Sequence, residues 1–229
     1  MVGPVKLATS SAGVNFLNVR YRKSWHFCSH IMHAMAAQLP TVLILAAGRG
    51  ERFRAAGGTD KLQEMLLGRR VRDWVTQAAR DSGLPWHVVE AAHTAHINSP
   101  GMGDSIACGV AATAGAAGWL ILPADLPLVQ ASSLLAVANA LQDHTVVVPL
   151  CAGQRGHPVG FGPQTRDALL ALRGDGGAAS VVAAWKPRGG VGVLALEDVG
   201  CITDVDTPDA LRAAQALALQ MQTGQSVGE

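Results

Sequence analysis

Short runs of apolar residues recur along the chain from Thr41 onward, each followed by a polar or glycine-containing segment. Runs of this length, bounded by turn-forming residues, are typical of buried β-strands. We therefore predict strands over residues 42–46, 86–92, 118–125, 145–150 and 191–197.

Helical periodicity fills the intervals between these runs. Val71, Trp74, Val75 and Ala78 follow the spacing i, i+3, i+4 and i+7, which predicts a helix that ends at Gly83. Further helices are predicted over 105–115, along the face of Leu134, Val137, Ala138 and Leu141, and from Pro208 onward, with Thr207 as the N-terminal cap.

Regular alternation of strands and helices indicates an α/β fold with a mostly parallel sheet covered on both faces. In such sheets, ligands bind beyond the C-terminal ends of the strands. Each polar motif described below follows a predicted strand, so we expect these motifs to meet at one edge of the sheet.

The first residues of the chain lack this order. We interpret residues 1–39 as an N-terminal extension with little fixed structure, 40–222 as the domain, and 223–229 as a tail. The segment is not a signal peptide, because its apolar residues are interrupted by His26, His30 and His33. These histidines would share one face of a helix, which raises a metal site as an alternative. No carboxylate or cysteine completes a ligand set there, so we favour the extension.

Composition narrows the classes of function. The chain has 229 residues, 49% of them hydrophobic, and a net charge of +1, which suits one compact domain. Such a small charge does not favour nucleic acid or an anionic membrane as a partner, so any anion must be held by a local site. The four cysteines form no C-x-x-C pair, which makes a reducing cytoplasm the expected location.

The first candidate site is the segment from Thr41 to Lys61, "TVLILAAGRGERFRAAGGTDK". It contains neither the third glycine of a dinucleotide fingerprint nor the Gly-Lys-Ser/Thr of a phosphate-binding P-loop. Small residues at Ala46, Ala47 and Gly48 instead let a planar base approach the backbone. The cations that follow, Arg49, Arg52 and Lys61, can surround a polyphosphate.

Two further motifs supply carboxylates. Asp125 ends a strongly apolar predicted strand, where it can hold Mg²⁺ through oxygen ligands or cap a helix. In "CITDVDTPDAL", Asp204 and Asp206 alternate along an extended segment, so we expect only one of them to face the site. A capping role competes for Asp206, which precedes the last helix.

Six motifs in order resemble the nucleotidyltransferases of molybdenum cofactor maturation (MobA-like NTP transferases). They are "LAAGRGERF…DKL", "GMGDSIACGV", "LPADLPLV", "GQRGHPVGF", "GDGGA" and "DVDTPDA". The chain is most similar to the molybdenum cofactor cytidylyltransferase branch, since "LAAG" stands where the guanylyltransferase branch tends to have "LAGG". The resemblance runs from Thr41 to the final helix. Relative to the family, the segment before "GMGDS" looks shortened and the nucleotide loop lengthened.

The resemblance implies a three-layer Rossmann-like fold and Mg²⁺-dependent transfer of CMP from CTP to a phosphorylated pterin, with loss of pyrophosphate. Lys61 matches the family's loop lysine and Asp125 its metal-binding aspartate, with Asp204 as second metal ligand and Arg52 as a further catalytic cation. The implied nucleotide-binding residues are Leu45, Ala46, Ala47, Gly48, Arg49, Gly50, Lys61 and Ser105. A recipient molybdoenzyme is an additional implied partner.

The acceptor would be bound by two glycine-rich motifs. Arg155 and His157 lie in a predicted tight bend, and Gly176 and Gly177 are predicted to open a helix whose free amides bind a phosphate. Three alternatives remain at this point: transfer from GTP or to another acceptor, an NAD(P)H-dependent oxidoreductase, and a non-catalytic protein that delivers the cofactor.

Overall fold

The computed structural model describes residues 39–224, which belong to one compact unit, Gln38–Glu229. His26, His30 and His33 lie outside the described residues, so the alternative metal site there stays a prediction. Within the described part of the chain, no helix is long and apolar enough to cross a membrane.

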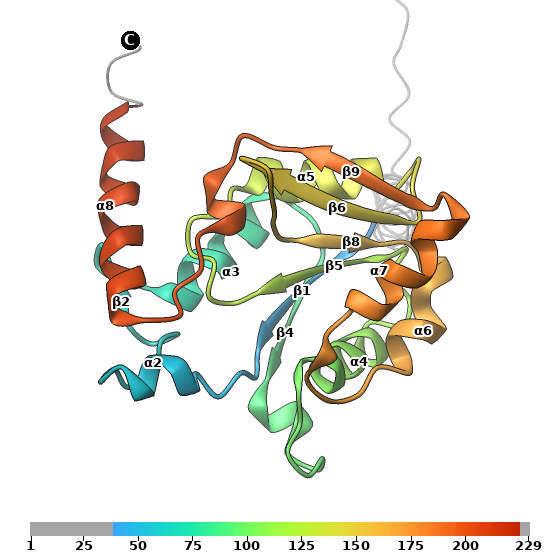
Figure 1. Cartoon of the computed structure of the whole chain (residues 1–229), viewed down its shortest axis with the longest axis horizontal. Coiled ribbons are helices and arrows are strands. Elements are labelled where there is room, and N and C mark those ends of the chain that lie inside the picture. Colours follow the sequence, from blue (N-terminus) through green and yellow to red (C-terminus); the bar gives the residue numbers. More distant parts are fainter. Residues whose placement is uncertain (1–38, 225–229) are drawn as a thin grey trace, which may run out of the picture. The chain divides into compact units, whose positions relative to one another are not determined.

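A seven-stranded sheet forms the centre of the unit (Figure 1). Strand β1 lies between β4 and β5, β8 joins β5 to β6, and β7 and β9 also pair with β6. The β1–β4, β1–β5 and β6–β9 pairs are parallel, and only β7 and β8 run in the opposite direction. The strands are β1 Thr41–Ala46, β4 Trp86–Glu90, β5 Trp119–Pro123, β6 Val146–Cys151, β7 Gln154–Arg155, β8 Val159–Phe161 and β9 Val191–Ala195.

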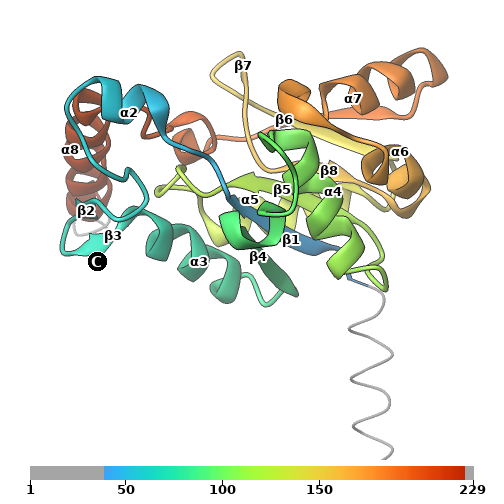
Figure 2. The same ribbon diagram turned by 90° about the horizontal axis from the view of Figure 1, so that it is seen from below.

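Helices cover both faces of this sheet (Figure 2). One face carries α3 (Val71–Asp81) and α5 (Ala131–Ala140), and α8 (Pro208–Gly224), which stands beside the sheet in Figure 1, adds residues to the same apolar cluster. The other carries α4 (Met102–Ala112), α6 (Arg166–Leu170) and α7 (Ala179–Trp185). The predicted α/β class and mostly parallel sheet are therefore confirmed.

The alternation of side chains along β1 explains why the sheet is buried on both faces. Val42 and Ile44 join the apolar cluster under α3, α5 and α8, whereas Leu43 joins the cluster under α4, α6 and α7. All three are essentially inaccessible to solvent. Because β1 has apolar residues at successive positions, it packs against the helices on both faces of the sheet, as expected for a central parallel strand.

All five predicted strands are present, with small shifts at their ends. The helix expected from Ser105 begins earlier, at Met102, because Gly101 already adopts the extended conformation of an N-terminal cap. Thr207 caps α8 as predicted: its Oγ1 accepts a hydrogen bond from the Ala210 amide at 3.1 Å. The short helix α2 (Glu51–Ala55) and the hairpin of β2 (Met65–Leu66) and β3 (Arg69–Arg70) were not predicted, because these segments are too short to show periodicity.

A bulge interrupts the hairpin formed by β6 with β7 and β8. Leu150 pairs with Arg155 and Val147 with Gly160, so three steps along β6 correspond to five steps along the returning chain. The extra residues lie around His157. Bulges of this kind re-aim side chains next to functional sites.

Candidate active site

A cleft of about 850 Å³ opens at the C-terminal ends of β1 and β5. The loop after β1, the loop after β5, the segment before α8, the N-terminus of α4 and the β7–β8 bulge all line it. The prediction that the strand-end motifs meet at one edge of the sheet is therefore confirmed.

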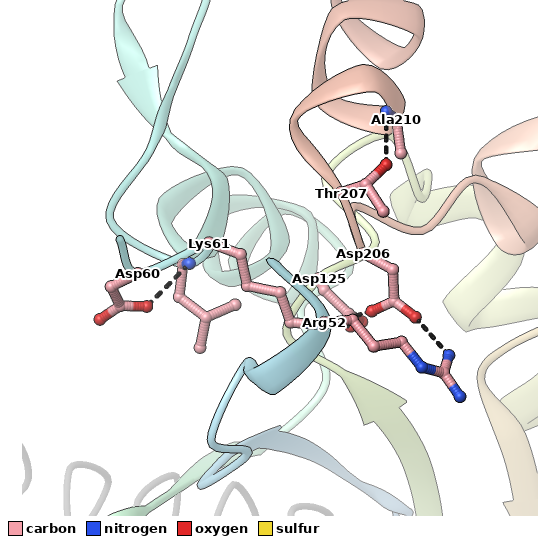
Figure 3. A network of polar contacts seen from close by, with 8 residues as sticks. Arg52, Asp60, Lys61, Asp125, Asp206, Thr207 and Ala210 are labelled. Atoms are coloured by element: carbon pink, nitrogen blue, oxygen red, sulfur yellow. Dashed lines mark hydrogen bonds and ion pairs between the residues drawn. The ribbon is translucent and has the colours of Figure 1, made fainter. Parts of the chain in front are cut away.

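An ion-pair network lies in this cleft. The Lys61 ammonium is 2.5 Å from Asp125 Oδ2 and 2.6 Å from Asp206 Oδ1. Arg52 donates to the other oxygen of Asp206 at 3.0 Å. Figure 3 shows that the carboxylates come from separate segments, with the Lys61 side chain reaching across to them from its own loop. The side chains of Lys61 and Asp125 are only 14% and 17% exposed.

Backbone contacts fix the two carboxylates side by side. The amide of Val205 donates to the carbonyl of Asp125 at 2.9 Å, which sets the segment before α8 beside the end of β5. The amide of Ala124 likewise donates to the Leu45 carbonyl and extends the β1–β5 pairing by one step. On either side of Lys61, Asp60 and Leu62 are joined by a hydrogen bond from the Leu62 amide to Asp60 Oδ1 (Figure 3).

The network favours the charged forms of Lys61 and Asp206. Burial alone would lower the pKa of Lys61, but the charge and hydrogen bond of Asp125, reinforced by Asp206, raise it above the ordinary value. Burial would likewise raise the pKa of Asp206, but Lys61 and then Arg52 outweigh it and lower that pKa. The site thus contains a fixed ammonium between two carboxylates.

The loop after β1 presents more positive charge to the cleft. Gly50 has φ of +58°, which glycine adopts without steric cost, and it precedes α2. Arg49 donates from Nη2 to Ser99 Oγ at 2.9 Å, so the loop is tied to the segment that leads into α4. The guanidinium of Arg54 in turn donates to the Arg49 carbonyl.

On the opposite side, Asp104 connects α4 to the loop of residues 173–177. Its Oδ2 accepts hydrogen bonds from the amides of Gly101 and Gly174, both at 2.9 Å. These two amides lower the pKa of the buried Asp104 carboxyl. The loop and the N-terminus of α4 are therefore a single hydrogen-bonded unit.

His157, on the β7–β8 bulge, also lines this cleft. Burial lowers the pKa of its imidazole, and the opposing effects of the Ile121 backbone, Asp125 and Asp204 do not compensate. Its Nδ1 is buried and has no hydrogen-bond partner among the described residues. The environment of His157 thus favours the neutral imidazole and leaves one ring nitrogen without a partner in the described part of the chain.

Most of the predicted site residues line the cleft. From the nucleotide group these are Leu45, Ala47, Gly48, Arg49, Gly50, Lys61 and Ser105, and from the other groups Arg52, Asp125, Asp204, Arg155 and His157. Three predicted residues do not line it: Ala46, which packs against the core, and Gly176 and Gly177. Ser105 lies within the first turn of α4 and donates from Oγ to the Gly101 carbonyl.

Two expectations require correction. Gly176 and Gly177 do not open a helix: Gly174–Gly176 form a 3-10 turn, Gly177 has φ of +54°, and α7 begins at Ala179. Gly177 therefore lies outside α7, whose N-terminal cap is Ala178. Asp204 and Asp206 were expected to point to opposite sides, yet both line the cleft. Residues 203–207, between η5 (Val199–Ile202) and α8, form no β-strand, so the strict alternation of side chains does not apply.

The sequence argument also underrated Asp206, whose position before α8 suggested a cap. Thr207 takes the capping role, which leaves Asp206 free to pair with Lys61 and Arg52. The order Asp-Thr-Pro in the sequence could have indicated this, because a helix needs only one N-terminal cap and Thr207 already supplies it.

The carboxylates fit a divalent cation that completes its shell with substrate oxygens. Within residues 39–224 no group of three or more His, Cys, Asp or Glu side chains is arranged to hold a metal ion. Mg²⁺ usually binds through one or two carboxylates plus phosphates and water, which is the donor set that Asp125 and Asp206 offer.

Comparison with known proteins places this site in a family. Residues 42–189 match the family model of the MobA-like NTP transferase domain, and this is more than half of the chain. The chain belongs to this family. The match covers the loops that carry Lys61, Asp125 and His157, and it stops before Asp206.

Relatives and solved structures of this MobA-like chain are distant. The bifunctional protein GlmU of Pelobacter propionicus is 29% identical over 143 residues, which are 55% of this chain and 31% of that protein. The chain thus spans about a third of the curated relatives it matches. Among the solved structures that share the fold are the following two. Rv0371c of Mycobacterium tuberculosis H37Rv has TM-score 0.65 and 24% identity, over 78% of this chain and 98% of that one. Mth528, a nucleotidyl transferase from Methanothermobacter, has TM-score 0.65 and 19% identity, over 80% and 99%.

Proposed function

We propose that this protein is a Mg²⁺-dependent nucleotidyltransferase that moves CMP from CTP to the phosphate of molybdopterin or the molybdenum cofactor. Pyrophosphate is the leaving group. The observation that carries the proposal is the cleft in which Lys61 lies between Asp125 and Asp206, with further cations on the loop after β1. Family membership supports the reaction class, and the "LAAG" and "GQRGHP" motifs support the choice of donor and acceptor.

The main task of the protein in this reaction is to bring the anionic acceptor and the anionic nucleotide together. The acceptor's phosphate attacks the α-phosphorus of the nucleotide in line, the bond to the β-phosphate breaks, and its electron pair leaves with pyrophosphate. A phosphate monoester is already anionic and needs no general base. Positioning and electrostatic stabilisation therefore dominate, as in other phosphoryl-type transfers.

The cations of the cleft have distinct tasks in this scheme. Arg49, anchored to Ser99, and Arg52, which is 83% exposed, are placed to bind the β- and γ-phosphates. Lys61 stays protonated and stabilises the charge that develops on the leaving oxygen. Ala47 and Gly48 leave room for the base against the backbone.

Asp125 and Asp206 would hold the metal ion, in place of the Asp125–Asp204 pair expected from the resemblance. When bound, Mg²⁺ neutralises the phosphates and acts as a Lewis acid on the reacting one. Asp204 and Asp125 both act on the pKa of His157, and we assign Asp204, His157 and Arg155 to the acceptor side of the cleft.

Thermal unfolding with CTP, GTP, ATP or NADPH, each with and without Mg²⁺, tests the proposal. A ligand at a hundredfold excess over its dissociation constant stabilises the native state by about 2.7 kcal/mol. For a chain of this size this corresponds to a rise in Tm of roughly 5–10 °C. We expect that rise for CTP with Mg²⁺, and a rise only with NADPH would overturn the proposal.

Asp125→Asn then tests the reaction itself. Pyrophosphate release with a phosphorylated pterin should fall by about 10²–10³-fold, because an electrostatic contact to the transition state is lost. Glu51→Gln is the matched control, since Glu51 lines the same cleft but pairs with Arg49 and does not contact Lys61. Equal loss of activity in both variants would contradict the role of Asp125.

A further inference from the structure

The ligand-free site already contains a cation where the metal ion would bind. One ammonium hydrogen-bonds to both Asp125 and Asp206, at 2.5 and 2.6 Å. The two acceptor oxygens therefore lie no more than about 5 Å apart, and a single cation contacts both of them. Lys61 thus occupies the position between the two carboxylates that a divalent ion needs.

The formal charges prevent Lys61 and a divalent ion from occupying this position at the same time. Lys61 and Arg52 balance Asp125 and Asp206, so the network is neutral as it stands. A divalent ion added beside an ammonium that is only 14% exposed would leave an excess of positive charge in a poorly solvated place. Like charges about 4 Å apart at an effective dielectric constant of 20 repel by several kcal/mol. The ion can enter only if Lys61 leaves.

A nucleoside triphosphate supplies a new partner for the displaced lysine. The cleft that holds the network is also lined by Arg49 and Gly50, on the loop proposed to bind phosphates. Lys61 follows that loop, and its side chain is long and unbranched, so a change of rotamers can redirect the ammonium to a phosphate oxygen. The negative charge of the nucleotide then offsets that of the incoming ion.

We propose that Lys61 acts as an internal substitute for the metal ion, which makes metal binding conditional on the nucleotide. A divalent cation binds the free protein weakly, and it binds firmly once a triphosphate draws Lys61 from Asp125 and Asp206. This inference rests on the proposed function for the identity of the second ligand. It adds an order of events: the metal ion arrives with or after the nucleotide, and binding of each strengthens binding of the other by the same factor.

Mn²⁺ binding without nucleotide, followed by the electron paramagnetic resonance signal of free Mn²⁺, tests the exchange. Lys61→Met and Lys61→Gln remove the competing charge, so both should bind Mn²⁺ at least tenfold more tightly than the wild-type protein. Adding Asp125→Asn to Lys61→Met should abolish the gain. Arg155→Met is the matched control: it removes a cation from the same cleft that forms no ion pair among residues 39–224, and it should change the affinity less than threefold.

A measurement on the wild-type protein covers the case in which the Lys61 variants fail to fold. Mn²⁺ alone should leave the amide resonances of residues 124–126 and 205–207 sharp, whereas Mn²⁺ with α,β-methylene CTP should broaden them. Broadening by Mn²⁺ alone at the same concentration would overturn the exchange.

The outcomes separate this inference from the proposed function. Equal Mn²⁺ affinity of wild-type and Lys61 variants overturns the exchange and leaves the nucleotidyltransferase proposal standing. A tenfold gain in the variants, with no triphosphate stabilising the wild-type protein, supports Lys61 as the internal substitute for the metal ion. It overturns the nucleotide as the ligand that displaces Lys61, and with it the proposed function. Failure of every variant to bind Mn²⁺, with or without nucleotide, overturns both the exchange and the metal site.

Discussion

Substitution of Gly101 by alanine tests how closely α4 approaches the loop of residues 173–177. A Cβ at Gly101 would lie 2.2 Å from the carbonyl carbon of Gly174 and 2.6 Å from the amide nitrogen of Asp175. Both are backbone atoms, and Cβ contacts below 3.0 Å essentially do not occur. The loop would therefore have to move by about 0.8 Å or more, which would disturb the hydrogen bond from the Gly174 amide to Asp104.

Overpacking of this kind typically costs about 1–3 kcal/mol. Taking about 2 kcal/mol, the Tm of Gly101→Ala should lie roughly 4–8 °C below that of the wild-type protein in a calorimetric scan. Gly176→Ala is the control in the same loop, because a Cβ there meets nothing within 4 Å and the residue has no positive φ. A Tm of Gly101→Ala within 1 °C of both other proteins would show that the loop does not pack against α4 as described.

Two further predictions concern His157 and Ala47. Because the pKa of His157 is lowered by burial, the unfolded chain binds a proton below about pH 6.5 that the native protein does not. Stability from this group is thus complete above that pH and is lost as the pH falls toward the lower native pKa, by at most about 1.4 kcal/mol per pH unit. Urea unfolding at pH 7.5 and 5.5 in EDTA should show a smaller loss for His157→Gln, and equal losses would refute the shift. Ala47→Gly should weaken a preference for CTP over GTP, since one methyl group in a pocket is worth about 1–3 kcal/mol, and competition binding with Mg²⁺ should show a reduced ratio. An unchanged ratio would mean that Ala47 does not contact the base.

The sequence by itself determined the layers of the fold. Apolar runs such as 42–46 can be buried only in a central strand, because their side chains alternate between two faces and both are apolar. Helical spacing at Val71 and Val75 likewise determines which side of α3 packs on the sheet. These patterns are local, so they could be recognised without any knowledge of the neighbouring elements.

The sequence also indicated which loops form the cleft, because parallel strands end at one edge and the polar motifs follow those strands. It identified Lys61 and Asp125 as residues of that edge. It could not show that one ammonium joins Asp125 to Asp206, since these carboxylates are 81 positions apart and meet through the Val205–Asp125 backbone contact.

Only the tertiary structure decided three features of the site. The pairing of Asp206 with Lys61 depends on the backbone contact between Val205 and Asp125. The position of His157 depends on a bulge whose register is set by pairing with β6. The shape of the 173–177 loop depends on its close backbone contact with Gly101, at the N-terminus of α4. Each is a contact between segments distant in the chain, and its geometry follows from packing and hydrogen bonding that no local residue pattern encodes.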